Sequence, residues 1–234
     1  MRFKEFTDID SLRHAKVDEK PVKNFTGNYK SLSISEPPTN TSKATQEELK
    51  KLKELMSNRT SDIEASVKNH DKDVAHSVKE YLKDKGLEYS DSDINKIVGV
   101  GSAIVRYYKN KFQRPRPYNL AEAMDMDFDN MPLESDTMKT PAYPAGHSLQ
   151  SRLIAEYYID KYPSHKEGLL EAAEKCSKGR LYAGWHYPSD HEASVKLAKQ
   201  IYPDMNLRES FAEHLLESII DIPRRTYAPG VFDE

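Results

Sequence analysis

The sequence contains a single cysteine, Cys176, among its 234 residues. One thiol cannot form a disulfide within the chain, so the fold cannot depend on covalent cross-links. Long hydrophobic runs are also missing, because the longest mostly apolar stretch, residues 97–105, is about half of the ~20 residues that span a bilayer. The N-terminus has no apolar segment of signal-peptide length. We therefore expect a soluble, cytoplasmic protein with no membrane partner.

An excess of charge of one sign is absent as well. The chain has 35 lysines and arginines against 38 aspartates and glutamates, which gives a formal net charge of -3. General nucleic-acid binders usually carry a strong basic excess, so no nucleic-acid partner is expected. Hydrophobic residues make up 37% of the chain and charged residues 31%, which suits one polar globular domain.

No stretch alternates between apolar and polar residues in the manner of a half-buried strand. Apolar residues recur at helical spacing, which predicts an all-α fold, a single-domain helical bundle. We expect an extended N-terminal arm in residues 1–43, the helical domain in residues 44–222 and a C-terminal tail in residues 223–234. In the second half of the domain, helices are expected at about 147–162, 165–183, 188–201 and 207–221.

Capping patterns predict two helices early in the domain. Two pairs of residues have the spacing of capping boxes, namely Thr45 with Glu48 and Ser61 with Glu64. From Ser61 the sequence predicts one long helix, whose apolar stripe leads to a terminating glycine: Ile63, Val67, Val74, Val78, Leu82 and Gly86.

A further helix is expected from residues 90–92 to a point before Arg114, which precedes a proline. Its Gly99 and Gly101 predict the close approach of a neighbouring helix. Residues 118–143 are then expected to form a long acidic loop with a functional role. Its acids are Glu122, Asp125, Asp127, Asp129, Glu134 and Asp136. Three of them resemble the start of a calcium loop, but the sixth-position glycine and the final glutamate are missing, which favours a flexible lid.

A histidine and an aspartate lie where the helix at 188–201 begins. Asp190 has the spacing of the apolar residues that follow it, so it faces inward, and a carboxylate is favoured in a first helical turn. An aspartate that accepts a proton from one ring nitrogen of His186 leaves the other nitrogen as a nucleophile or base. The alternative interpretations are a simple helix cap for Asp190 and a structural role for His186.

Several cations could bind an anion. Arg180 shares the apolar face of its helix, where an arginine is costly unless it meets an anion or a protein carboxylate. Lys109 and Arg116 belong to a basic run that by itself indicates a solvated face. We keep that interpretation for the remaining members of the run, which are Arg106, Lys111 and Arg114.

His147 follows a Pro-Ala-Gly turn at the start of a predicted helix, where free N–H groups favour an anion. Gly146 would let the backbone approach such a ligand closely. The alternative is a turn followed by a capping histidine. A zinc site formed by His186, Asp190 and His191 is disfavoured, because adjacent residues on a helix cannot readily face one site.

Order and spacing of these residues resemble the three-part signature of the type 2 phosphatidic acid phosphatase (PAP2) superfamily. The motifs read Lys109-x6-Arg116-Pro117, Pro144-Ala145-Gly146-His147 and Gly179-Arg180-x5-His186-x3-Asp190. Its soluble members include the bacterial class A non-specific acid phosphatases, and vanadium haloperoxidases share the site. The resemblance implies that Lys109, Arg116 and Arg180 hold the phosphate, which suits their positive charge.

The resemblance also implies that His186 attacks phosphorus, that Asp190 orients its ring and that His147 protonates the leaving oxygen. Two positions depart from the family pattern. Ala145 and Gly179 stand where many members have serine, so two hydroxyl groups are missing. We expect a weaker or differently selective enzyme, since one such contact stabilises a transition state by about 1–3 kcal/mol.

The sequence thus predicts a phosphatase that needs neither metal nor cofactor and acts on small soluble phosphomonoesters through a phosphohistidine. Phosphate transfer to alcohols is a side activity to expect, and the resemblance suggests a homo-oligomer. Two alternatives remain at this point. One is a vanadate-dependent haloperoxidase, and the other is a phosphate-binding or interaction module that has lost turnover.

Overall fold

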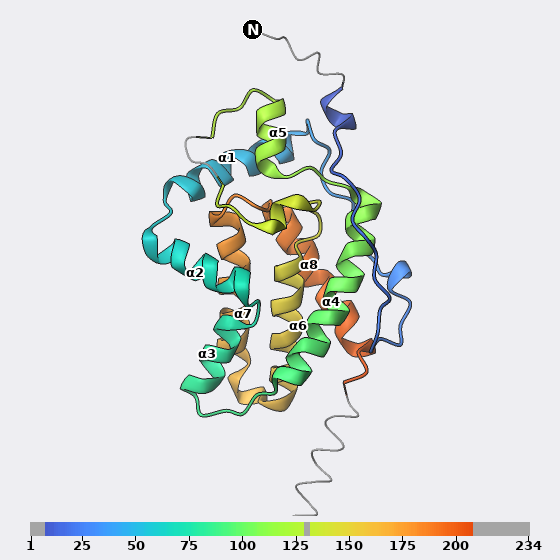
Figure 1. Cartoon of the computed structure of the whole chain (residues 1–234), viewed down its shortest axis with the longest axis vertical. Coiled ribbons are helices and arrows are strands. Elements are labelled where there is room, and N and C mark those ends of the chain that lie inside the picture. The colour runs from blue at the N-terminus through green and yellow to red at the C-terminus, as the bar shows by residue number, and fades with distance from the viewer. Residues whose placement is uncertain (1–7, 129–131, 208–234) are drawn as a thin grey trace, which may run out of the picture.

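Helix α6 (Gly146–Lys161) is the centre of the fold in the computed structural model, which describes residues 8–128 and 132–207 (Figure 1). It packs against α4 (Asp91–Phe112), α7 (Lys166–Tyr182) and α8 (Pro188–Ile201). Its apolar side chains join those of the three neighbours in the largest core cluster. Its N-terminal turn, which carries His147, is therefore held by the best-packed part of the molecule.

Within the described ranges every regular element is helical, and an isolated bridge between Phe25 and Met205 is the only β-type pairing. The predicted all-α class is thus confirmed. The remaining α-helices are α1 (Lys43–Ser57), α2 (Ser61–Lys72), α3 (His76–Asp84) and α5 (Pro117–Ala123). Short 3-10 helices span Ile9–Ser11, Tyr29–Ser31, Asp136–Lys139, Pro163–His165 and Tyr202–Asp204. None of the described helices is long and apolar enough to cross a membrane.

The long helix expected from Ser61 to Gly86 is in fact two helices, α2 and α3. Asp73 follows α2 in an extended conformation, and its carboxylate accepts hydrogen bonds from the Ala75 N–H at 2.9 Å and from Lys79 at 2.9 Å. Such local side-chain bonds compete with helical ones and end the helix. The apolar stripe persists because both helices pack on α7. Gly86 terminates α3 as expected, with φ at +67°.

The capping residues also differ from the expected ones. Ser42 and Thr60 cap α1 and α2, and their hydroxyl oxygens accept from the N–H groups of Thr45 and Ile63. The side chain of Glu48 is used elsewhere, as described below. A helix cap of this kind needs a serine or threonine hydroxyl three residues before a free N–H. More than one residue meets that requirement near the start of α1 and near the start of α2.

The acidic segment 118–143 is not wholly a loop, because α5 and the 3-10 helix at Asp136–Lys139 lie in it. Pro117 starts α5 at a position that suits its fixed φ, and the helix buries Leu120 and Ala121 against the side chains of α1. Asp129 falls in the gap between the described ranges. The helix expected at 207–221 and the tail at 223–234 likewise lie outside the described residues, apart from Leu207.

Residues 8–42 run over the surface of the bundle and along α4 (Figure 1). The Asn110 side chain pairs with the backbone of Val17 in both directions at 2.8 Å, and the His14 N–H donates to the Gln113 carbonyl. The expected N-terminal arm is therefore held against α4, close to the C-terminal end of that helix.

One of the two glycines of α4 fits the expected close packing. A Cβ at Gly101 would lie 3.0 Å from Gln150 and 3.4 Å from Leu153, both on α6. A Cβ at Gly99 would meet no atom within 4 Å. The expectation is thus confirmed for Gly101 and wrong for Gly99.

Candidate active site

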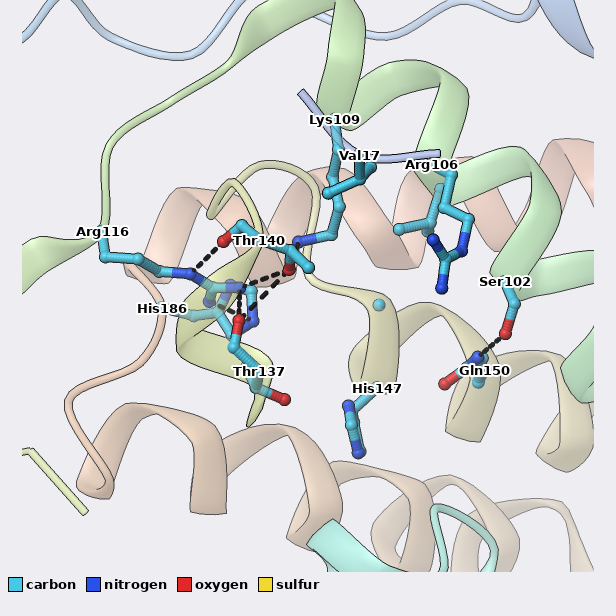
Figure 2. A pocket seen from close by; sticks show the side chains of 12 residues that line it. Val17, Ser102, Arg106, Lys109, Arg116, Thr137, Thr140, His147, Gln150 and His186 are labelled. Carbon is cyan, nitrogen blue, oxygen red and sulfur yellow. Dashed lines mark hydrogen bonds between the residues drawn. The ribbon is translucent and has the colours of Figure 1, made fainter. Parts of the chain in front are cut away.

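Most of the residues singled out in the sequence surround one cavity of about 180 Å³ (Figure 2). Its lining includes Lys109, Arg116, Gly146, His147 and His186. Asp190 lies behind His186 and is fully buried. Arg180 is not part of the lining, but it is buried beside Trp185, the residue before His186. Three motifs far apart in the sequence therefore meet at the start of α6.

His186 has a fixed hydrogen-bonding pattern. Its Nδ1 lies 3.1 Å from Asp190 Oδ2, and its Nε2 lies 3.0 Å from Arg116 Nη1. A guanidinium can only donate, so Nε2 accepts, and Nδ1 therefore carries the proton that bonds the carboxylate. The ring is thus neutral, with the Nε2 lone pair on the side of the cavity.

Asp190 combines the structural role and the chemical role proposed for it. It is the third residue of α8, and its Oδ2 accepts from the Tyr187 N–H at 3.0 Å, which caps the helix. Its Oδ1 accepts from Arg114 Nη1 at 2.6 Å. Because both oxygens have partners, the carboxylate holds the His186 ring in one orientation.

Arg116 is fully buried at the wall of the cavity. It donates to the backbone oxygens of Thr140 at 2.7 Å, Thr137 at 2.5 Å and Trp185 at 2.7 Å, in addition to His186. No carboxylate within the described residues pairs with it. A buried guanidinium with only neutral acceptors retains a strong attraction for an anion.

Lys109 faces Arg116 across the cavity from α4, and its ammonium donates to the Pro141 carbonyl and to the Thr140 hydroxyl at 3.3 Å. Only 6% of the residue is exposed. Burial, with nearby Arg116, lowers its pKa well below the usual value. An anion placed between Lys109 and Arg116 would reverse that effect, because it favours the charged form of both.

Arg180 lies on α7 with its guanidinium carbon 4.0 Å from the centre of the Trp185 ring. Its Nη2 donates to Asp71 and to the Thr137 hydroxyl, both at 2.9 Å. Its Nε and Nη1 are buried and have no hydrogen-bond partner. Unsatisfied donors on a buried charged group are costly, and an oxyanion is the natural acceptor for them.

His147 lies in the first turn of α6, where Gly146 begins the helix. No side chain caps this helix, so its first N–H groups remain available to a ligand. The ring is partly exposed, and its Nε2 lies 3.9 Å from Asp71 Oδ1. A Cβ at Gly146 would meet only Val105, at 3.6 Å, so the packing does not require a glycine there.

Burial and the cations of the site together lower the pKa values of both histidines well below the usual range. Burial is the largest cause for each ring. For His147 the next cause is Arg180, and for His186 it is Arg116. Burial also lowers the pKa of Arg116 to about 9. The site therefore carries a positive field that a phosphate group would complement.

Arg114 and Asp71 contact the candidate site residues, although the sequence did not predict it, and the expected solvated position of Arg114 is wrong. Arg114, expected on a solvated face, is buried and bonds both Asp190 and Glu48. Nothing in the Arg-Pro-Arg-Pro repeat separates it from Arg116. Asp71, which pairs with Arg180, had a detectable signal, because it follows Val67 by four residues on the apolar face of α2.

Of the other cations in the basic run, Lys111 is exposed as expected, whereas Arg106 lines the cavity. His191 does not join His186, because its Nε2 lies 3.2 Å from Glu174 of α7. No cluster of three potential metal ligands occurs in the part of the chain that the structure describes.

The two departures from the serine pattern have different surroundings. Ala145 is fully buried, and its carbonyl accepts from Ser194 at 3.0 Å. Gly179 faces α2, where an added Cβ would lie 3.4 Å from Val67. A small residue at 179 thus lets α2 pack closely on α7, whereas the packing gives no comparable reason for the alanine at 145.

The chain is similar in sequence to proteins of known families. The family model described as the PAP2 superfamily matches residues 94–198. A non-specific acid phosphatase from Providencia stuartii is 24% identical over 124 residues, which are 52% of this chain and 48% of that protein. The chain thus spans about half the length of this curated relative.

A transmembrane PAP2-type phosphatidylglycerolphosphate phosphatase from Bacillus subtilis is similar in structure. The TM-score is 0.47 at 15% identity, and the match covers 75% of this chain and 89% of the other. The family match in sequence includes the whole set of motif residues, namely Lys109, Arg116, Gly146, His147, Arg180, His186 and Asp190. Residues 94–198, which contain these motif residues, are therefore similar to the PAP2 superfamily.

Proposed function

We propose that this protein is a metal-independent phosphatase that hydrolyses small soluble phosphomonoesters through a phosphohistidine at His186. The observation that carries the proposal is the neutral His186 ring, whose proton is on the side of Asp190 and whose Nε2 lies beside Arg116. A lone pair next to a positive group is arranged to attack an electrophile that bears negative charge.

In the first step the Arg116 N–H turns from His186 Nε2 to a phosphoryl oxygen. The freed Nε2 lone pair then forms a bond to phosphorus while the bond from phosphorus to the leaving oxygen breaks. Lys109, Arg116 and Arg180 balance the charge on the remaining phosphoryl oxygens, and the free N–H groups of α6 add to this. His147 gives its proton to the leaving oxygen, so that a neutral alcohol departs.

In the second step the neutral His147 accepts a proton from a water molecule, whose oxygen attacks phosphorus. The bond between phosphorus and Nε2 breaks, and inorganic phosphate leaves. An alcohol that replaces the water would give a new phosphomonoester, which is the phosphotransferase activity expected from the sequence.

The size of the cavity, about 180 Å³, supports a small substrate. The arm residue Val17 forms part of its wall. We propose a cytoplasmic location on the basis of the sequence, and a homo-oligomer on the basis of the family resemblance. Cell fractionation and light scattering test these two points.

Turnover of p-nitrophenyl phosphate with excess EDTA tests the proposal. We expect full activity with the chelator and a loss of at least 10³-fold in His186→Ala, as is typical when a nucleophile is removed. His191→Ala is the matched control, because it removes a partly buried histidine of α8 that pairs with Glu174. Activity that needs a metal, or that survives His186→Ala, would contradict the mechanism.

His147→Ala separates the proton donor from the nucleophile. p-Nitrophenolate leaves without a proton, whereas an alkyl oxygen needs one. We therefore expect this variant to lose much more activity on an alkyl phosphate than on p-nitrophenyl phosphate. An equal loss on both substrates would assign another role to His147.

A further inference from the structure

One side of the cavity is not used by the proposed chemistry. Arg106, Ser102 and Gln150 form this side, with Arg106 three residues before Lys109 on α4 (Figure 2). Residues three apart on a helix are neighbours on one face, so Arg106 lies next to the cation that would hold the phosphate. We call these three residues the outer subsite.

Arg106 differs from most arginines of the helical region, residues 43–207. Four of the six arginines there pair with carboxylates: Arg59 with Glu64, Arg114 with Glu48 and Asp190, Arg152 with Glu156, and Arg180 with Asp71. Arg106 and Arg116 have no carboxylate partner among the described residues. These two are also the arginines that line the cavity.

The bond that Arg106 does make leaves most of its donors free. Its Nη1 donates to the Asp18 carbonyl of the arm at 3.0 Å. Figure 2 shows its guanidinium directed toward the cavity, on the same side as Gln150 and Ser102. An arginine presents five N–H donors in a planar fork, which matches a phosphate or a carboxylate.

Two side chains of this side, Gln150 and Ser102, are polar, whereas the cavity wall next to Arg106 also includes the apolar Val17 and Val105. The Gln150 amide donates to the Ser102 hydroxyl oxygen at 2.6 Å. This leaves the Gln150 carbonyl oxygen as an acceptor and the Ser102 hydrogen as a donor. Such groups suit an oxygen-rich leaving group better than a hydrocarbon one.

We propose that the outer subsite binds a second anionic group of the substrate through Arg106. The preferred substrates are then phosphomonoesters whose alcohol carries another phosphate or a carboxylate near the ester oxygen. This inference rests on the proposed phosphate site between Lys109 and Arg116. Its competitor is a purely structural role, in which Arg106 only fastens the arm through Asp18.

Binding of two phosphonates, measured by calorimetry on the full chain, tests the proposal without relying on turnover. Methylphosphonate has one anionic group, whereas methylenediphosphonate has two. Neither ligand is turned over, because P–C bonds resist hydrolysis. The wild-type protein should bind the diphosphonate at least ~10-fold more tightly, as expected for added hydrogen bonds between charged groups. Arg106→Gln should abolish most of that preference, and Arg106→Lys should retain part of it.

Lys111→Gln is the matched control, because it removes one positive charge from the exposed side of the same helix. It should keep the wild-type preference. The proposal is wrong if Arg106→Gln keeps the preference for the diphosphonate. It is also wrong if the variant weakens the binding of both phosphonates equally, because that result would indicate a loosened arm. If the wild-type protein binds neither phosphonate, the proposed phosphate site itself is wrong.

Discussion

His147 and His186 lie in the field of the same cations, and this shared field determines how the site responds to pH. Burial and the neighbouring positive groups lower both pKa values well below the usual 6.5. In the proposed mechanism this lowered pKa keeps His186 neutral, as a nucleophile requires. His147 would lose its proton too early to act as a donor, unless the negative charge of the substrate raises its pKa again.

We therefore expect the pH profiles of kcat/KM and kcat to differ. The profile of kcat/KM reports the free enzyme, so activity should already fall at a pH well below 6.5, as free His147 loses its proton. The profile of kcat reports the complex, in which the phosphoryl group offsets the cations, so its fall should come at higher pH. Coincident profiles would show that substrate charge does not control His147.

The same shifts set the direction of acid destabilisation. A histidine whose pKa is lower in the folded state binds fewer protons there than in the unfolded state. Its contribution to stability is present above pH 6.5 and is lost as the pH falls toward the lowered pKa.

The buried position of Arg114 could not be predicted from the sequence. The periodic pattern correctly predicted the inward orientation of Asp190 and Arg180, because helical spacing relates them to apolar residues. Arg114 follows the end of α4, where no period applies, and its two carboxylate partners come from α1 and α8. Such long-range pairing leaves no local signal.

Replacement of Arg114 by glutamine should destabilise the fold by about 3–5 kcal/mol, because it leaves buried carboxylates without their cation. The free energy of urea unfolding measures this, with Lys111→Gln as the exposed control. A change below about 0.5 kcal/mol would mean that Asp190 and Glu48 are held by their other hydrogen bonds alone.

At the scale of whole elements, the existence of the helices was easier to predict than their ends. The stripe through Val67, Val74 and Val78 continues across two helices because both pack on α7. The break between them depends on bonds made by Asp73, whose sequence context also suits a helix interior. Helix ends are decided by such single interactions, which apolar periodicity does not record.

Gly99 and Gly101 of α4 provide a matched pair of substitutions. Gly99→Ala should stabilise the protein by about 1 kcal/mol, since the added methyl meets open space and alanine favours the helix. Gly101→Ala should bring no such gain, because the methyl presses on Gln150 and Leu153. If both substitutions changed the thermal stability equally, α6 could move away from α4 at no cost in free energy.

On the scale of the whole molecule, the arm and the bundle together form the site. Val17 reaches the cavity wall although Asn110, which holds it, lies 93 positions later in the chain. The sequence predicted an extended arm but could not predict its path, because extended segments without a period give no indication of where they pack.

Asn110→Ala should release this part of the arm, because it removes both hydrogen bonds to Val17. We expect faster amide hydrogen exchange near Val17 and a smaller difference in kcat/KM between bulky and small phosphomonoesters. Asn95→Ala, at an exposed position of the same helix, should change neither. Unchanged exchange in Asn110→Ala would mean that other contacts hold the arm.

The unpaired Nε and Nη1 of Arg180 have a practical consequence for anyone who purifies this protein. A ligand that binds only the folded state stabilises it in proportion to the logarithm of its concentration. If the proposed site binds phosphate, we expect phosphate and sulfate buffers to raise the melting temperature and to slow the assay by competing with the substrate. Buffers such as Tris chloride or HEPES will give the lower melting temperature and the true rate.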